Sequence, residues 1–205
     1  MASGVTFTKE EIGKINQQVL SRYGRVAAGE WGKLFRYPIG REGLDGLGYD
    51  KSVTSALDSA TASTFCGVSH VFCSGPVASG ASTLDIGCGA GVDTIIAANM
   101  AGPNGRAVGV DMTPGMISKA KTNAEKSGVA NVSFLQASAE SLPFPDASFD
   151  MAVSNGVFNL VVDKEKALAE AWRVLRPGGR LAIADQTLAD ETPRDVETMT
   201  RNWGR

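Results

Sequence analysis

The residues with the clearest chemical potential lie in TLDIGCGAGVDT, residues 83–94, where one acid precedes three glycines at alternate positions. Asp85 ends a short apolar run, and Gly87, Gly89 and Gly91 follow it. Glycine allows positive φ angles and lets a ligand touch the main chain. The stretch therefore predicts a tight binding loop with a carboxylate in front of it.

Two kinds of cofactor compete for this loop. A dinucleotide fingerprint has the glycine order G-x-G-x-x-G and places a pyrophosphate at a helix N-terminus. Here the third glycine comes one residue early, and the carboxylate of Asp85 would repel a phosphate. An amino acid that carries a sulfonium fits better, because carboxylates and carbonyls accept from its ammonium while loop amides donate to its carboxylate. S-Adenosylmethionine is such a ligand, and a nicotinamide dinucleotide is the less favoured alternative.

A second acid, Asp111, ends the apolar run RAVGVDM. A carboxylate at this place can accept hydrogen bonds from both hydroxyls of a ribose. Its separation from the glycine loop is that expected of one strand-helix-strand unit. The ordered set of strand, loop, helix and second acid supports a cofactor site more strongly than either acid does alone.

The cysteines and the single histidine suggest further chemistry. Cys66, His70 and Cys73 have the spacing C-x3-H-x2-C, which offers three metal ligands. A structural zinc site takes four protein ligands and no fourth lies nearby, so we predict no metal and interpret His70 as an ordinary loop or pocket residue. Cys88, inside the glycine loop, is interpreted as a small packing residue.

A regular framework after residue 82 must position these groups. Apolar runs rich in Val, Ile, Leu and Phe predict five strands, separated by helix-like stretches. This alternation predicts an α/β fold with a doubly wound, mostly parallel, Rossmann-like sheet. The predicted strands are 82–87, 106–112, 131–137, 149–155 and 179–186, and the predicted helices are 91–101, 114–127 and 163–175.

Ligands of such sheets bind beyond the carboxyl ends of the strands, where the strand order reverses. We therefore expect the loops that follow Asp85, Val110, Leu135 and Ser154 to meet at one site.

The chain before residue 82 has a different pattern. Residues 9–31 carry apolar side chains at helical spacing, whereas residues 36–82 are rich in Gly, Ser and Pro and predict an irregular cap with one short helix at 52–60. We expect a single domain, made of an N-terminal helix and cap at 1–82 and a cofactor-binding core at 83–205.

Composition narrows the classes of function. The 205 residues are 43% apolar with a net charge of −2, and the cations are scattered, which argues against a nucleic-acid partner. The polar N-terminus does not resemble a secretory signal, and no segment has the length of about 20 apolar residues that spans a bilayer. We predict a cytoplasmic protein with no membrane partner and with free thiols.

At this point the chain resembles the class I S-adenosylmethionine-dependent methyltransferases, in the branch that contains ubiquinone and arsenite methyltransferases. The resemblance covers residues 83–185 and includes LDIGCGAG, VGVDMTPGMISKA, AESLPFPDASFDMAVS and EAWRVLRPGGRLAIAD. It implies that Asp85, Gly87, Cys88 and Gly89 cradle the methionyl end of S-adenosylmethionine, with Gly91 completing the loop.

The resemblance also implies roles for the other loops. Asp111 and Met112 would hold the ribose and flank the adenine, and Asn155 would line the pocket beneath the sulfonium. The amino edge of the adenine meets an acid and the next backbone amide in the family, and Ser138 and Ala139 stand in that place here. Serine binds this edge without charge, so we expect weaker adenine binding than in relatives that have the acid.

The methyl acceptor is predicted from the same resemblance. The stretch LGYDKSVTSALDSATASTFCGVSHVF is similar to the arsenite branch, where a Cys-Gly pair supplies a thiolate for trivalent arsenic, and Cys66 and Gly67 match it. The second thiolate of that branch lies where this chain has Gly156, and a thiophilic centre needs two or three thiolates. We predict a small-molecule acceptor, either arsenite-like or organic, with Cys66 as the candidate catalytic residue.

Methyl transfer from a sulfonium is a direct displacement that needs alignment and exclusion of water rather than a catalytic triad. We therefore predict no general base. The aromatic residues Trp31, Phe35 and Tyr37 are interpreted as core packing, with lining of the substrate pocket as the alternative. A different class of function also fits, namely a catalytically silent module that binds the cofactor and serves a partner subunit.

The predicted sheet stops after its fifth strand. Residues 187–205 predict one helix but none of the antiparallel strands that follow in the family. Three alternatives stay open: a five-stranded sheet with an exposed edge, a truncated copy of the fold, or an edge that self-associates or takes a protein partner.

Overall fold

The computed structural model describes residues 6–31, 34–35, 37–187 and 196–203. Its centre is a five-stranded sheet in which every neighbouring pair is parallel. The strand order is β3-β2-β1-β4-β5. The strands are β1 (Ser82–Ile86), β2 (Arg106–Asp111), β3 (Val132–Gln136), β4 (Phe149–Asn155) and β5 (Leu175–Ala184).

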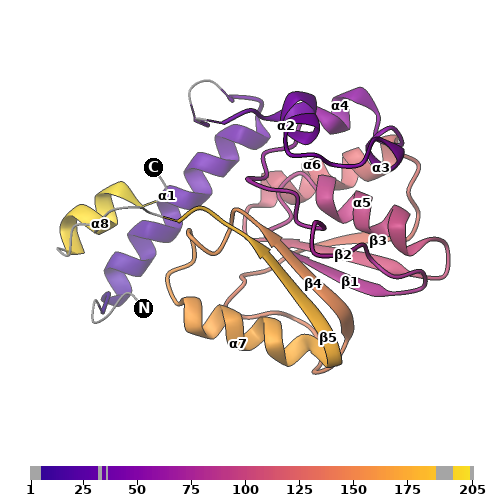
Figure 1. Ribbon diagram of the computed structural model, residues 1–205. Coiled ribbons are helices and arrows are strands. Elements are labelled where there is room, and N and C mark those ends of the chain that lie inside the picture. Colours follow the sequence, from indigo (N-terminus) through magenta and orange to yellow (C-terminus); the bar gives the residue numbers. More distant parts are fainter. Residues whose placement is uncertain (1–5, 32–33, 36, 188–195, 204–205) are drawn as a thin grey trace.

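Helices cover both faces of the sheet (Figure 1). Helices α5 (Val92–Ala101) and α6 (Pro114–Lys126) lie on one face, and α7 (Lys164–Val174) lies on the other. Successive strand residues point to opposite faces, so each strand contributes to two cores. In β4, for example, Ala152 joins the core on the α7 side, whereas the next residue, Val153, joins the core under α5. The α/β doubly wound prediction is confirmed.

The strand order reverses between β1 and β4, which are neighbours although two strands separate them along the chain. At this switch point the crossover helices leave in opposite directions, and the diverging loops open a crevice at the carboxyl ends of the strands. The crevice begins where β1 and β4 end, at Ile86 and Asn155.

The first helix, α1 (Lys9–Ala27), starts at a capping box in which Thr8 and Glu11 satisfy each other's backbone amides. It packs against α6 and against the last helix, α8 (Val196–Asn202). The prediction of a helix over 9–31 was too long, because Gly29 takes a φ of 90° just after the helix ends. The predicted C-terminal helix is confirmed at α8, and residues 188–195 and 204–205 lie outside the described residues.

The prediction of an irregular cap over 36–82 was partly wrong. The segment contains three short helices instead of one at 52–60: α2 (Gly40–Gly46), α3 (Lys51–Thr54) and α4 (Ser59–Ala62). The single predicted helix is split because Asp50 and Asp58 each cap the start of a new one. The glycine-rich α2 forms because tertiary packing buries Leu44 completely, a gain that outweighs the poor helix propensity of glycine. The division into a cap at 1–82 and a core at 83–205 stays a prediction.

The last strand, β5, forms an exposed edge of the sheet. Among the described residues β5 pairs only with β4, and Ile183 is 41% exposed. The strand begins at Leu175 rather than at the predicted 179, because Leu175 already pairs with Phe149 before a register shift. None of the described helices has both the length and the apolar character needed to cross a lipid bilayer.

Candidate active site

A cleft lies at the carboxyl ends of the strands, and its empty space of about 820 Å³ includes the part that is open to solvent. All four loops predicted to meet there contribute to it, together with α1 and the cap. Its walls include Asn16, Val19, Tyr23, Cys66, Gly87, Gly89, Asp111, Met112, Ser138, Ala139, Glu140, Asn155, Gly156 and Leu160. A smaller hollow of about 350 Å³ shares Cys66, Gly87, Gly89 and Asn155 with the cleft and is lined also by Asp85 and Asp93.

The glycine loop has the bare backbone that its sequence predicts. Gly87 and Gly89 have φ angles of 76° and 51°. A Cβ on Gly87 would lie 2.3 Å from Val157, whereas a Cβ on Gly89 would meet nothing within 4 Å. Because Gly89 lines the cleft, that open space is where a ligand can approach the main chain.

Asp85 lies beneath this loop and is only 2% exposed. Its carboxylate accepts a hydrogen bond from the Thr94 hydroxyl at 2.6 Å. Burial raises the pKa of Asp85, and the nearby carboxylate of Asp93 raises it further. Asp85 lines the smaller hollow rather than the main cleft. None of the described ion pairs places a cationic side chain beside it.

Asp111, at the end of β2, forms another part of the cleft wall. Its carboxylate accepts from the Gly89 amide at 3.0 Å and from the Thr113 amide at 2.8 Å. These bonds occupy one acceptor position on each oxygen and leave the others for a ligand in the cleft. Burial raises the pKa of Asp111 in spite of both bonds. Met112, the next residue, also lines the cleft.

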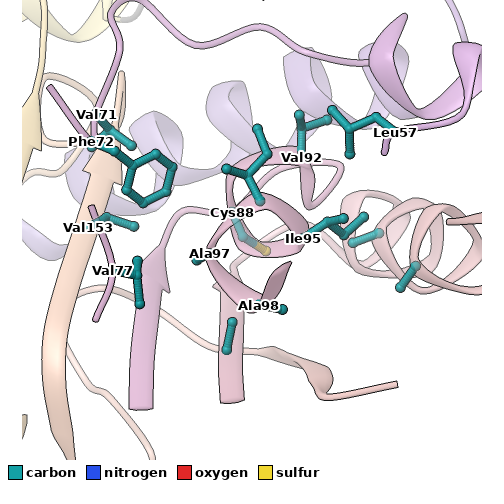
Figure 2. Close-up of a cluster of buried hydrophobic side chains, with 14 of the residues drawn as sticks. Leu57, Val71, Phe72, Val77, Cys88, Val92, Ile95, Ala97, Ala98 and Val153 are labelled. Atoms are coloured by element: carbon teal, nitrogen blue, oxygen red, sulfur yellow. The ribbon is translucent and has the colours of Figure 1, made fainter. Parts of the chain in front are cut away.

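Two residues of the glycine loop have packing roles in this structure. Gly91 caps α5 with a φ of 83°, and a Cβ there would lie 2.8 Å from the Phe134 ring. Cys88 is buried in the core with Val92, Ile95 and Val153 (Figure 2), and its sulfur would lie 2.8 Å from a Cβ on Gly109. Neither Gly91 nor Cys88 lines the main cleft, which supports the interpretation of Cys88 as a packing residue.

The loop after β3 forms the next wall. Ser138 and Ala139 line the cleft as predicted, and Glu140 lines it beside them. The Ser138 hydroxyl accepts from the Glu140 amide at 3.2 Å, and a Glu140 carboxylate oxygen accepts from the Asp163 amide at 3.0 Å. Glu140 was not predicted as a site residue, although the acid in AESLPFPD could have indicated it.

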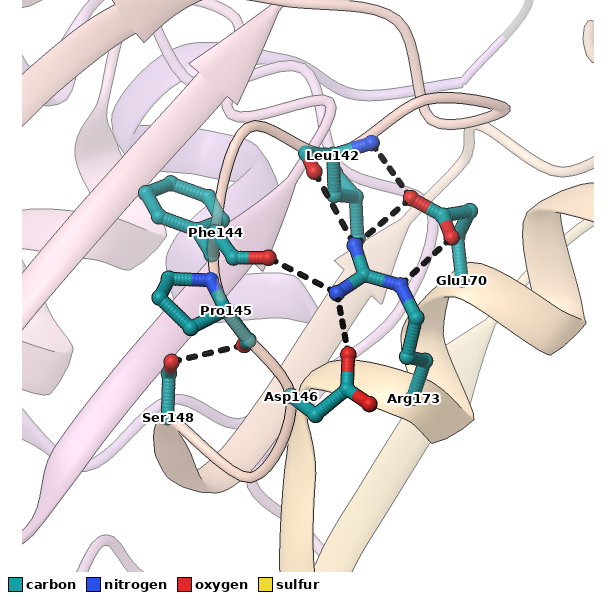
Figure 3. Close-up of polar contacts among 7 residues, drawn as sticks. All are labelled: Leu142, Phe144, Pro145, Asp146, Ser148, Glu170 and Arg173. Atoms are coloured by element: carbon teal, nitrogen blue, oxygen red, sulfur yellow. Dashed lines mark hydrogen bonds and ion pairs between the residues drawn. The ribbon is translucent and has the colours of Figure 1, made fainter.

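Arg173 of α7 holds the chain that follows this wall (Figure 3). Its guanidinium donates to the carbonyl oxygens of Leu142 and Phe144 and to the carboxylates of Asp146 and Glu170. These hydrogen bonds lower the pKa of Glu170 to about 2, with the arginine as the main cause. The arginine thus fixes residues 142–146, and this anchoring limits movement of the cleft wall just before them.

Cys66 lies where the cleft and the smaller hollow meet. Burial raises the pKa of its thiol to about 12, and Asp111 and Asp93 add to the effect, so the thiol is neutral at pH 7. The carbonyl oxygen of Cys66 accepts from the Tyr37 hydroxyl at 3.1 Å. Cys73 is exposed, and the described residues contain no group of three His, Cys, Asp or Glu side chains that could hold a metal. The alternative of a Cys66, His70 and Cys73 metal site gains no support.

Two of the three aromatic residues, Trp31 and Phe35, have the predicted packing role. Trp31 and Phe35 pack against a small core formed by Val26 and Met116, with ring centroids 6.0 Å apart. Tyr37 instead reaches the backbone of Cys66, and Tyr23 of α1 lines the cleft. The sequence favoured packing for all three, and it did not indicate Tyr23.

S-Adenosylmethionine fits the chemistry of these walls. Asp85 is buried and Asp111 is half-buried, and neither has a cationic side chain among the ion pairs of the described residues, so a ligand with two positive groups would compensate them. The bare backbone at Gly89 suits close approach of a methionyl chain, and the Asp111 carboxylate suits a ribose. A pyrophosphate would instead meet the same acids and be repelled.

Residues 78–204 match a family described as a methyltransferase domain. The chain belongs to this family. Over 156 residues it is 42% identical to the arsenite methyltransferase of Halobacterium salinarum, a match that covers 76% of this chain and 39% of that protein. The domain is also 43% identical over 111 residues to a ubiquinone/menaquinone biosynthesis C-methyltransferase of Hahella chejuensis, covering 53% of this chain and 44% of the relative.

A solved structure shares the fold over most of the methyltransferase domain. The crystal structure of an arsenic (III) S-adenosylmethionine methyltransferase from Chlamydomonas reinhardtii superposes with a TM-score of 0.53 and 31% identity, covering 73% of this chain and 50% of that one. This chain spans 39% to 44% of the length of the two curated relatives named above. The individual roles of the site residues stay predictions.

Proposed function

We propose that this methyltransferase domain transfers a methyl group from S-adenosylmethionine to a small molecule. The observation that carries the proposal is the cleft at the β1/β4 switch point, where the open backbone of Gly89 donates a hydrogen bond to the half-buried carboxylate of Asp111. The names of the similar proteins support the same reaction. The predicted cytoplasmic location, and a protein partner at the β5 edge, are parts of this proposal.

The residues of the chain would act by binding and orienting. Bound S-adenosylmethionine would supply a methyl group on a sulfonium, which is already activated for displacement. Asp111 and Met112 would hold the nucleoside, and Ser138, Ala139 and Glu140 would form the wall for its base. Cys66 would close the acceptor side and keep water from the reacting atoms, so no general base is assigned.

The acceptor is proposed to be small, because the space proposed for it is confined to the place where the cleft and the smaller hollow meet at Cys66. Trivalent arsenic is one candidate, supported by the names of the similar proteins. Against it, Cys66 carries the one thiol in the cleft lining, and Gly156 stands in that lining where the arsenite branch has its second thiolate. A small organic acceptor needs no such thiolate pair.

A specific observation keeps the silent cofactor-binding module as the second candidate. The cofactor side of the cleft has its acids and bare backbone, whereas the acceptor side offers a single neutral thiol. Such a domain would bind S-adenosylmethionine and serve a partner without transferring the methyl group itself.

Calorimetry followed by transfer assays tests the proposal. Titration with S-adenosylmethionine should give heat and a single site, while nicotinamide dinucleotide should give none. Incubation with radiolabelled cofactor and arsenite, quinol or thiol acceptors should then label one acceptor. Binding without transfer to any acceptor would favour the silent module, and heat from the dinucleotide alone would overturn both.

A further inference from the structure

Asp93 is a buried carboxylate that the proposed cofactor contacts do not use. It lies in the first turn of α5 and is 7% exposed. One carboxylate oxygen accepts from the Tyr49 hydroxyl at 2.7 Å, and the other accepts from the Asn155 side-chain amide at 2.9 Å. Asp93 therefore joins three elements, because Tyr49 belongs to the cap and Asn155 ends β4.

The carboxylate determines which way the Asn155 amide points. A carboxylate only accepts, so the NH₂ group of Asn155 faces Asp93 and the carbonyl oxygen faces the cap. That oxygen accepts from the Val68 amide at 2.8 Å and from the Ser69 amide at 3.3 Å. The NH₂ group also donates to the Ser69 carbonyl at 2.9 Å. Asn155 thus binds the cap backbone as a neighbouring strand would.

Gly67 shows how closely the cap lies on this amide. A Cβ at Gly67 would be 2.3 Å from the Asn155 side-chain nitrogen, so no larger residue fits there without movement. Cys66 directly precedes Gly67 and lines both the cleft and the smaller hollow. The Tyr49 ring packs edge-on against Phe65 at 5.4 Å, which holds the other side of Cys66.

We propose that Asp93 is a positioning residue that acts through Asn155 and Tyr49 to hold residues 65–69 as the wall of the cleft that carries Cys66. It touches neither cofactor nor acceptor in this role. Only the consequence for methyl transfer rests on the proposed function, because the hold on the cap is a property of the protein alone.

A double-mutant cycle measured by hydrogen exchange tests this chain of contacts. Asp93→Ala and Asn155→Ala should each speed amide exchange in residues 67–71 by about tenfold or more, because buried donors lose a charged or amide partner. If Asp93 acts through Asn155, the double variant should add little to either single variant. Unchanged exchange in Asp93→Ala, or fully additive effects, would overturn the proposal.

Two controls separate this local loosening from general destabilisation. Amides of β2, at 107–110, report global opening and should keep their exchange rates in every variant used. Asp163→Ala removes an exposed acid from the start of α7, where it accepts from the Lys166 amide, and should leave residues 67–71 protected. Equal loss of protection in β2 would show that the fold, and not the cap segment, depends on Asp93, and the proposal would fail.

A conservative variant separates positioning from a direct charge effect on the cofactor. In Asp93→Asn the new side-chain amide can accept a hydrogen bond from Asn155 and donate one to the Tyr49 hydroxyl oxygen. The Tyr49 hydroxyl can then donate its own proton to the Ser69 carbonyl oxygen, which is 3.2 Å away. The positioning role predicts that exchange in 67–71 stays within about threefold of wild type, since the hydrogen bonds are replaced. A large loss of S-adenosylmethionine affinity in Asp93→Asn, with protection intact, would assign Asp93 to charge compensation instead.

Kinetics of Tyr49→Phe complete the test, because this variant keeps the ring packing and removes the hydroxyl that joins Asp93 to the backbone of Ser69 and Val71. The acceptor KM should rise about threefold or more while the dissociation constant of S-adenosylmethionine changes by less than about twofold. An equal change in both constants would contradict the proposal. If the wild-type protein transfers no methyl group, the proposed function fails, but the exchange cycle still decides the role of Asp93.

Discussion

The Gly89 amide donates to the Asp111 carboxylate at 3.0 Å, and this bond makes one wall from the loop after β1 and the end of β2. The two residues are 22 positions apart and come from adjacent parallel strands. Because the same carboxylate also accepts from the Thr113 amide, its orientation is set before any ligand arrives. The proposed cofactor site is therefore preorganised around Asp111.

Replacing Asp111 should weaken cofactor binding. Asp111→Asn keeps the size of the side chain but replaces one acceptor oxygen with a donor that would face a backbone amide. We expect the dissociation constant of S-adenosylmethionine to rise by about 10- to 100-fold, the effect of losing a charged hydrogen bond. Calorimetry measures it, and Glu125→Gln on the exposed face of α6 is the control with the same charge change. Similar affinities in both variants would remove Asp111 from the site.

The open space at Gly89 gives a second prediction. Gly89→Ala places a methyl group into the cleft and also strains a residue with a φ of 51°. Gly80→Ala is the matched control, because Gly80 has a φ of 79° and the same free space but does not line the cleft. We expect both variants to lose about 1 kcal/mol of stability and only Gly89→Ala to lose binding of S-adenosylmethionine. Thermal unfolding and calorimetry measure the two effects separately.

Cofactor affinity should rise with pH. Burial, and then the Asp93 carboxylate, raise the pKa of Asp85, and burial raises that of Asp111, so the free protein retains protons that ordinary acids have lost. A cationic ligand favours the ionised acids, so binding releases protons between the ordinary carboxyl pKa and the raised one. Affinity should increase by up to about tenfold per pH unit for each proton released, and become level above the raised pKa.

Calorimetry in phosphate and in Tris buffer measures this proton release directly, because the buffers differ in ionisation enthalpy. The demethylated product, which lacks the sulfonium charge, should release fewer protons than S-adenosylmethionine. Proton uptake on binding of either ligand would contradict the assignment of these acids to the cofactor, and identical proton release for the two ligands would show that the acids respond to the ammonium rather than to the sulfonium.

Arg173 should be more important for stability than other surface arginines. Arg173→Lys keeps the charge but loses most of the bonds to Leu142, Phe144 and Glu170. With the side chain 30% exposed, we expect a loss of about 1–2 kcal/mol, measured by urea unfolding. Arg176→Lys is the control, since this residue is 45% exposed and pairs mainly with Asp150. An equal loss in both would show that the network around residues 142–146 adds nothing.

A second thiol should create a site for trivalent arsenic. Gly156 lines the cleft together with Cys66, so Gly156→Cys places two thiols on one cavity. Gly156 has a φ of 74°, so the substitution is strained, and Gly156→Ala measures that strain alone. We expect an organic trivalent arsenical to bind Gly156→Cys about tenfold or more tightly than wild type, because two thiolates hold such a centre. No gain over Gly156→Ala would show that the two sulfurs do not meet.

The sheet could be predicted because its signals are local. Each strand is a short apolar run bounded by turn residues, and Ser82–Ile86 and Arg106–Asp111 lie within a residue of their predicted ranges. Parallel pairing followed from alternation with helices, and it placed Asp111 opposite the glycine loop. The helix Gly40–Gly46 had no such signal, because its stability comes from the burial of Leu44 by distant parts of the chain.

The sequence by itself determined the sheet, the glycine loop and the two acids at the strand ends, because strand period, glycine and strand order are written in neighbouring residues. Only the tertiary structure decided that Glu140 joins the cleft and that Asp93 bonds to Tyr49 and Asn155. The last contacts join residues 44 and 62 positions apart, and no local pattern encodes a hydrogen bond at that separation.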